Sequence, residues 1–259
     1  MSHSKKISLI SRLHYLKLVF RSLLFLAAAA AYVIRRVRGI PFSLNTITDR
    51  PLILGIIAAI FFSEMLLRFF PSNLESMGCQ KQFAKNYIPK EPSIPHQSTW
   101  RTTLLVALVW LLLNGLIGLV YFLGWIDEGI LLLICLFYSV CDMICILFFC
   151  PFQTWIMKNK CCGSCRIYNW DYAMMFTPLL FIPSLYTWSL LGLALVLLVI
   201  WEGIYHRHPE RFYEQTNESL KCVNCPEKLC HHKKQLRSFL KKRKIELSEE
   251  LKKLGLDRQ

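Results

Sequence analysis

The sequence predicts an all-α integral membrane protein with a Cys-rich extramembrane loop and a basic C-terminal helical tail. Its bundle has four transmembrane helices, or five if a first, shorter segment also spans. Hydrophobic residues make up 54% of the 259-residue chain, and they gather into blocks of about 20 residues, the length that crosses a bilayer core. Lys and Arg lie mainly at the N-terminus, in the loops and in the tail, where positive charge anchors membrane proteins. Most of the 11 cysteines follow the apolar blocks.

The apolar segments that are long enough to span are residues 51–70, 102–125, 130–149 and 172–201. The last of these exceeds a span by about ten residues, and Pro178 and Pro183 fall in its first half. Proline interrupts helical hydrogen bonding. We therefore expect a kink, or a short interfacial segment, before the last spanning helix.

The first apolar segment, residues 18–34, is a weaker candidate. It carries Arg21, and its uninterrupted apolar part, residues 22–34, is shorter than a full span. The basic run that follows it resembles a membrane-surface anchor, so we expect an uncleaved helix on the cytoplasmic surface. The chain then divides into a basic arm with this helix (residues 1–50), a transmembrane bundle (51–202) that includes the Cys-rich loop (150–171), and a tail (203–259).

The formal net charge of +14 is explained by cytoplasmic retention and anionic lipid, and no motif for nucleic-acid binding accompanies it. The lipid bilayer is therefore the expected partner, and we predict a multi-pass protein of the cell membrane with a cytoplasmic tail. Four spans place the loops of Cys79 and Cys161 outside. Residues 233–254 carry leucines at three- and four-residue steps, which predicts an amphipathic helix that binds a membrane surface or a membrane or redox partner protein.

The tail contains a run of potential metal ligands within eleven residues: Cys222, Cys225, Cys230, His231 and His232. A C-x2-C pair directs two thiolates at one ion, and the following cysteine and histidines complete a tetrahedral Cys3His set. This pattern favours zinc over an iron–sulfur cluster, which uses similar ligands. The alternatives without metal are reduced surface cysteines or a disulfide.

The loop after the third span contains Cys150, Cys161, Cys162 and Cys165. Gly163 permits a tight turn, so Cys162 and Cys165 can chelate one ion or form a disulfide, with Cys150 as a further partner. Metal binding and disulfide formation remain equal hypotheses. If residues 172–201 cross the membrane once, this loop and the tail lie about 30 Å apart and cannot share an ion.

Charged residues inside the apolar segments are functional candidates, because an intramembrane charge is expensive. Asp142 shares a helix face with Cys135 and Ser139, whereas Cys141 and Cys145 are expected to be core packing. Glu64 and Arg68 are spaced for an ion pair on one helix face. A sharper alternative joins Glu64 with Asp142 as proton-carrying groups in the bundle interior.

The function that these patterns favour is a multi-pass membrane metalloprotein with Cys-ligated zinc or iron–sulfur sites and a role in redox or electron transfer. One alternative is a membrane thiol-disulfide oxidoreductase that uses the cysteines of residues 161–165 and holds a quinone in its bundle. Another is a non-enzymatic adaptor with a zinc-stapled tail. Whether the chain is an enzyme stays open, and the candidate catalytic residues are Asp142, Cys162 and Cys165.

Overall fold

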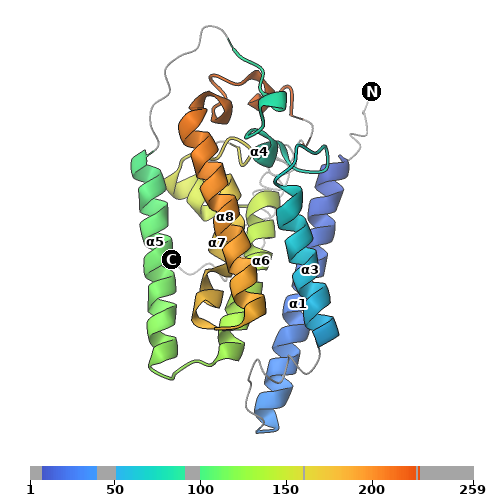
Figure 1. Cartoon of the computed structure of the whole chain (residues 1–259), viewed down its shortest axis with the longest axis vertical. Coiled ribbons are helices and arrows are strands. Elements are labelled where there is room, and N and C mark those ends of the chain that lie inside the picture. The colour runs from blue at the N-terminus through green and yellow to red at the C-terminus, as the bar shows by residue number, and fades with distance from the viewer. Residues whose placement is uncertain (1–7, 40–50, 91–99, 160, 226, 228–259) are drawn as a thin grey trace, which may run out of the picture.

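The computed structural model describes residues 8–39, 51–90, 100–159, 161–225 and 227. Within these ranges the regular structure is helical, with one isolated bridge between Pro89 and Asn217. The long helices run roughly parallel to the long axis of the molecule (Figure 1). The predicted all-α class is therefore confirmed.

Helix α1 (Leu9–Val37) has 29 residues. It contains the whole of residues 18–34, the segment predicted to be a short interfacial helix. The Ser8 side chain caps its N-terminus by accepting a hydrogen bond from the Ser11 amide at 3.2 Å, and basic residues in its last turn complement the helix dipole. The helix packs along α6, and Arg21 is 1% exposed. Arg21 pairs with Glu64 and Asp142 inside the bundle, and α1 is long and apolar enough to span a membrane. The interfacial placement of this helix stays a prediction.

Helix α3 (Pro51–Leu67) has 17 residues, and α5 (Trp100–Phe122) and α6 (Glu128–Leu147) follow with 23 and 20. The turn between α5 and α6 uses Gly124 at a φ of 76° and an Asp127 cap whose side chain accepts from the Ile130 amide. Within the described residues, α1, α5, α6 and α8 (Leu185–Arg207) are long and apolar enough to cross a membrane, whereas α3 is shorter.

The last apolar segment is broken, as its prolines predict. It consists of α7 (Asp171–Phe176), the 3-10 turn η4 (Thr177–Phe181) and α8, with Pro178 near the start of η4 and Pro183 just before the cap of α8. Figure 1 shows the chain descending through α7, turning back and rising through α8, and the two helices pack against each other. Residues 172–201 therefore do not form one continuous helix, because the chain reverses between α7 and α8.

This reversal brings the Cys-rich loop and the start of the tail to one end of the molecule, which we call the cap end. The cap end comprises residues 72–90, 148–159, 161–170, 208–225 and 227. Arg166 in the loop forms a bidentate ion pair with Glu202 near the end of α8, and the Trp170 indole donates to the same carboxylate at 2.7 Å. The Glu227 carboxylate accepts from the Met77 amide, which also ties the tail to the Cys79 loop. The described start of the tail therefore lies at the same end of the molecule as these loops, whereas a single crossing by residues 172–201 would separate them by about 30 Å.

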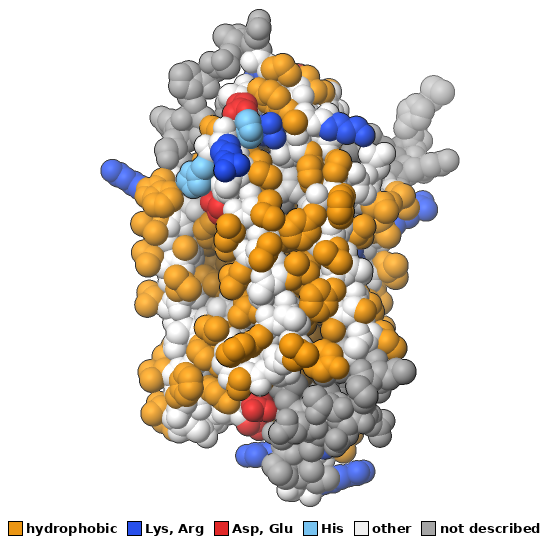
Figure 2. All heavy atoms as spheres, in the orientation of Figure 1, with side chains coloured by type: hydrophobic (Ala, Val, Ile, Leu, Met, Phe, Trp, Pro, Cys, Tyr) orange, Lys and Arg blue, Asp and Glu red, His pale blue; other side chains and the backbone are white. Residues whose placement is uncertain are grey.

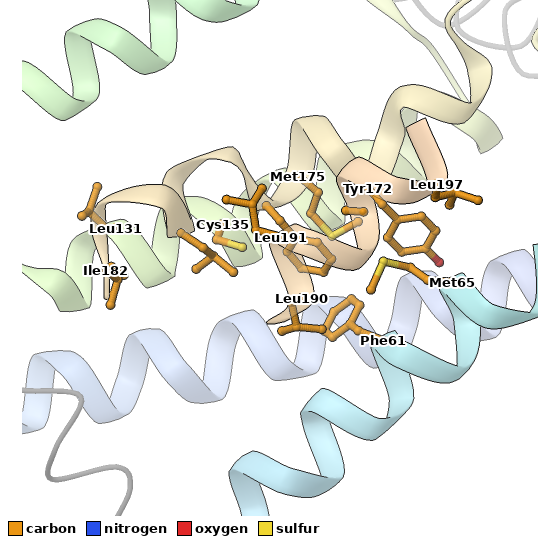
Figure 3. Close-up of a cluster of buried hydrophobic side chains, with 13 residues drawn as sticks. Phe61, Met65, Leu131, Cys135, Tyr172, Met175, Ile182, Leu190, Leu191 and Leu197 are labelled. Atoms are coloured by element: carbon orange, nitrogen blue, oxygen red, sulfur yellow. The ribbon is translucent and has the colours of Figure 1, made fainter. Parts of the chain in front are cut away.

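The core lies where α3, α6, α7 and α8 meet. Figure 3 shows Phe61 and Met65 from α3 beside Tyr172 and Leu190, and Met65 is fully buried. The outer faces stay apolar: the exposed large hydrophobic side chains include many leucines of α5. Figure 2 shows hydrophobic side chains across the middle of one face and charged ones toward its two ends. An apolar belt around the middle of a molecule is typical of a surface that contacts lipid or another apolar surface.

Candidate functional site

A cavity of about 520 Å³ lies at the cap end of α6. Its wall is apolar and rich in aromatic side chains, and it is of a size that holds a small molecule. The Trp110 and Tyr138 rings lie 4.7 Å apart by centroid, and Phe152 lies 6.1 Å from Trp110. The other side chains of its wall include five cysteines, Cys141, Cys145, Cys150, Cys162 and Cys165, and two carboxylates, Asp142 and Asp171.

The chain turns back at the end of α6 and brings two of these cysteines, Cys145 and Cys150, close together. The helix stops at Leu147, the Phe149 amide reaches back to the Ile144 carbonyl at 3.1 Å, and Pro151 precedes a π-helical turn, η2 (Phe152–Ile156). Proline favours such a helix start because it lacks an amide donor. The turn returns Cys150 to the last turn of α6, where its side chain lies next to that of Cys145.

Cys162 lies beside this pair. Its Sγ is 2.8 Å from Gln153 Oε1 and 3.7 Å from the Cys145 carbonyl oxygen. The predicted tight turn around Gly163 is confirmed, since the Cys165 amide donates to the Cys162 carbonyl at 2.9 Å. Cys165 itself is a free thiol, 4% exposed, so the Cys162–Cys165 disulfide is not formed in this structure.

Cys165 and Cys79 are the least accessible thiols of the cap end. Cys165 packs with Val106 and Ile167, and burial raises the pKa of its thiol. Cys79 is 1% exposed, and burial raises the pKa of this thiol strongly. Because the thiolate is the reactive form, burial makes both thiols poor nucleophiles.

Lys81, which follows Cys79 in the chain, binds the backbone of the Cys-rich loop. Its fully buried ammonium donates to the Gly163 and Cys165 carbonyl oxygens at 3.0 and 2.8 Å. The ammonium also lies 5.6 Å from the Trp201 ring centroid, a cation–π distance. Burial lowers the pKa of this amine to about 8. The cation therefore joins the Cys79 loop, the Cys-rich loop and α8.

The carboxylates of the cavity belong to a buried charge network. Arg21 donates to the Asp142 and Glu64 carboxylates at 2.9 and 2.8 Å and to the Ser139 carbonyl at 3.1 Å. The Tyr172 hydroxyl donates to Glu64 at 2.9 Å. These contacts confirm the predicted Ser139 and Asp142 face and link Glu64 to Asp142 through a cation.

Arg68 makes the second ion pair of this network. It donates to Asp171 Oδ1 at 2.6 Å, and its guanidinium lies 4.4 Å from the Tyr172 ring centroid. The predicted ion pair between Glu64 and Arg68 is therefore replaced by two pairs that join different helices. Sequence spacing within one helix could not reveal this, because the partners lie far along the chain.

The predicted metal ligands do not form one group in the part of the chain that the structure describes. No set of three or more His, Cys, Asp or Glu side chains there could hold an ion. Cys222 is exposed, and Cys225 is half-buried. Cys161 lies on the cap side, with its Sγ 3.8 Å from where a Cβ on Gly163 would stand. Cys230, His231, His232 and the predicted helix of residues 233–254 lie outside the described residues, so the tail metal site stays a prediction.

Sequence reasoning missed two members of the site. Cys145 was assigned to core packing, although the spacing Cys145-x4-Cys150-Pro151 carries a signal, because proline after the second cysteine marks a chain reversal. The charge of Arg21 predicts a weaker membrane helix, whereas in the structure Arg21 binds two carboxylates. An arginine in an apolar segment could have been paired with the acidic residues of other segments.

Comparison with known proteins adds no identification: no family model, curated protein or solved structure matches this chain.

Proposed function

We propose that this chain is a multi-pass membrane thiol oxidoreductase in which Cys145 and Cys150 pass electrons to an apolar acceptor of the quinone class. The observation that carries the proposal is the contact between these two side chains in the wall of one apolar cavity. Disulfide formation needs two thiols whose alpha carbons approach within about 4.4–6.8 Å. The end of α6 at Leu147 lies between the two cysteines, so a bond between them does not have to join consecutive turns of a regular helix.

The reaction balances without another co-reactant. The Cys145 and Cys150 thiols lose two protons and two electrons as the S–S bond forms, and the quinone gains both to become a hydroquinone. Aromatic side chains such as Trp110 and Phe152 suit a planar ring, since offset and edge-on packing of aromatic groups is favourable. The apolar wall also suits the hydrocarbon tail of a membrane quinone.

Cys162 is assigned the exchange with partner proteins. Its thiolate attacks the Cys145–Cys150 disulfide, releases one thiolate and forms a mixed disulfide, which a partner dithiol reduces in two exchange steps while becoming oxidised. The position of Cys162 Sγ, 3.7 Å from the Cys145 carbonyl oxygen, supports this role. Cys165, a candidate for the same role from its sequence, is a positioning residue of the loop, because its thiol is buried.

We assign the cap end to the cytoplasm. The N-terminal arm, the loops at this end and the long tail carry most of the Lys and Arg residues, against Arg35, Arg36 and Arg38 at the far end of α1. Positive charge is retained inside. Cytoplasmic thiols are kept reduced, so electrons would flow from a reduced partner through Cys162 into the membrane quinone.

The experiment uses the full chain, reduced and reconstituted in lipid nanodiscs, with a fully substituted benzoquinone that has a decyl tail. Such a ring leaves no position for thiol addition. We expect about one quinone reduced per protein, as the two-electron balance requires, and loss of this turnover in the Cys145→Ser and Cys150→Ser variants. Cys222→Ser, which removes an exposed cysteine of the cap end, is the matched control. Equal quinone reduction in all variants would refute the proposal.

A further inference from the structure

Asp171 presents an unused hydrogen-bond acceptor beside the cavity. Its side chain is 6% exposed and contributes to the cavity wall. Oδ1 accepts from Arg68 at 2.6 Å and from the Tyr172 amide at 2.9 Å. Oδ2 is buried and has no hydrogen-bond partner among the described residues.

A buried carboxylate oxygen without a donor is costly. The other carboxylate of the cavity, Asp142, is bound by Arg21 through Oδ2, so its charge is compensated within the protein. Arg68 compensates the charge of Asp171 through Oδ1 alone. A neutral donor, such as a hydroxyl group, would satisfy Oδ2 without adding a second charge beside Arg68.

We propose that Asp171 Oδ2 accepts a hydrogen bond from a ring hydroxyl of the cavity ligand, so that the site binds a hydroquinone more tightly than its quinone. This inference rests on the proposed function for the choice of ligand. A hydroquinone has a hydroxyl donor at each ring oxygen, whereas a quinone has only carbonyl acceptors, which would face the Asp171 carboxylate without a proton between them.

The preference has a consequence for the redox reaction. A site that binds the reduced form more tightly makes its bound quinone a stronger oxidant, and each tenfold difference in affinity corresponds to about 30 mV in a two-electron potential. Asp171 therefore acts as a positioning and specificity residue that favours electron flow from the thiols to the ring.

The test separates binding from electron transfer by using the Cys145→Ser/Cys150→Ser double variant, which cannot form that disulfide. Calorimetry in nanodiscs compares the decyl benzoquinone with its hydroquinone. We expect the hydroquinone to bind roughly 10- to 100-fold more tightly, the range of a hydrogen bond to a charged group. Equal affinity, or tighter binding of the quinone, would overturn the inference, and this comparison does not depend on any substitution of Asp171.

Adding Asp171→Asn to this background should reverse the preference. Because both protein donors face Oδ1, the Asn carbonyl takes that position and its NH2 group takes the position of Oδ2, where it can donate to a quinone carbonyl. Glu218→Gln, which removes a carboxylate paired with Lys221 at the cap end, should leave the preference unchanged. An unchanged preference in Asp171→Asn would also overturn the inference.

Failure of this inference and of the proposed function can be told apart. If the chain with its native cysteines reduces the quinone but the hydroquinone preference is absent, only the role of Asp171 falls. If neither ring form binds the cavity, the choice of a quinone falls as well.

Discussion

Lys81 illustrates how a single buried residue can organise the cap end. A fully buried lysine is rare unless its ammonium is satisfied, and here two backbone carbonyls and the rings of Trp201 and Phe212 surround it. Burial still disfavours its charged form and lowers its pKa to about 8 from 10.5. The residue therefore makes the stability of the fold depend on pH.

The sign of this dependence follows from proton binding. Between pH 8 and 10.5 the unfolded chain holds a proton on this lysine that the folded chain tends to release, so stability rises with pH in that window. The contribution amounts to about 3 kcal/mol at most. In thermal unfolding of the reconstituted protein, we expect the rise of Tm between pH 8 and pH 10 to be smaller in Lys81→Met.

Lys221→Met serves as the control for this prediction, because Lys221 lies partly exposed in a surface ion pair with Glu218. It should keep the wild-type dependence of Tm on pH. The same slope in Lys81→Met as in the wild type would contradict the buried, destabilised charge.

Glu227 makes the stability of the fold depend on pH with the opposite sign. Burial raises the pKa of its carboxyl group to about 7 from 4.5, so between pH 4.5 and pH 7 the folded chain binds more protons than the unfolded chain. Stability should therefore fall as pH rises through this window. Glu227→Gln should flatten that fall in a Tm profile from pH 4.5 to pH 7.5, and a profile unchanged by the substitution would argue against burial of this carboxyl.

Sequence reasoning at this scale succeeded where one helix face suffices and failed where partners come from different helices. The joint face of Ser139 and Asp142 follows from helical periodicity, and Arg21 contacts both. The pairing of Glu64 with Arg21, and of Arg68 with Asp171, depends on how α1, α3 and α7 pack. A single sequence does not specify that packing.

At the scale of elements, the reversal at Pro183 depends on a close approach between η4 and α5. A Cβ placed on Gly118 of α5 would lie 2.3 Å from Cζ of Phe181 in η4, so the ring must move if any side chain is added. Gly118→Ala should lower the unfolding free energy by about 1–3 kcal/mol, the usual cost of overpacking.

Gly115→Ala is the matched control, because a Cβ at this position of the same helix meets nothing within 4 Å. It should be neutral or slightly stabilising, since alanine favours helix more than glycine does. Chemical or thermal unfolding in detergent would compare the two, and equal stability of both variants would contradict the close packing of η4 on α5.

The helical elements were largely predictable from the sequence, because apolar blocks and their breakers are local signals. The predicted segments 102–125 and 130–149 match α5 and α6 to within a few residues. The break between α7 and α8 follows from Pro178 and Pro183. The direction taken after the break was not predictable, since a kinked crossing and a reversal contain the same local signals and differ only in tertiary packing.

At the scale of the whole molecule, the reversal determines which segments share an end. The proposed topology places Cys222 of the tail and the short turn after α5 on opposite sides of the membrane. Trp125 in that turn is 77% exposed and offers a site for a probe at the far end. In sealed inside-out vesicles, where the cytoplasmic face is outside, a membrane-impermeant maleimide should label native Cys222.

The control is a Trp125→Cys variant in the Cys222→Ser background, which should react only after the vesicles are permeabilised. Labelling of both positions from the same side would contradict the arrangement of the helices across the membrane. Labelling only of Trp125→Cys in intact inside-out vesicles would leave that arrangement but invert the proposed orientation.

The most direct test of the central claim is to map the disulfide that forms when the reduced, reconstituted protein is exposed to the decyl benzoquinone. Remaining thiols are alkylated, and peptides are analysed by mass spectrometry without reduction. The account predicts a Cys145–Cys150 disulfide that appears as hydroquinone forms. If the quinone is reduced but Cys145 and Cys150 are both recovered in the alkylated form, which shows that they were still free thiols, the account is contradicted.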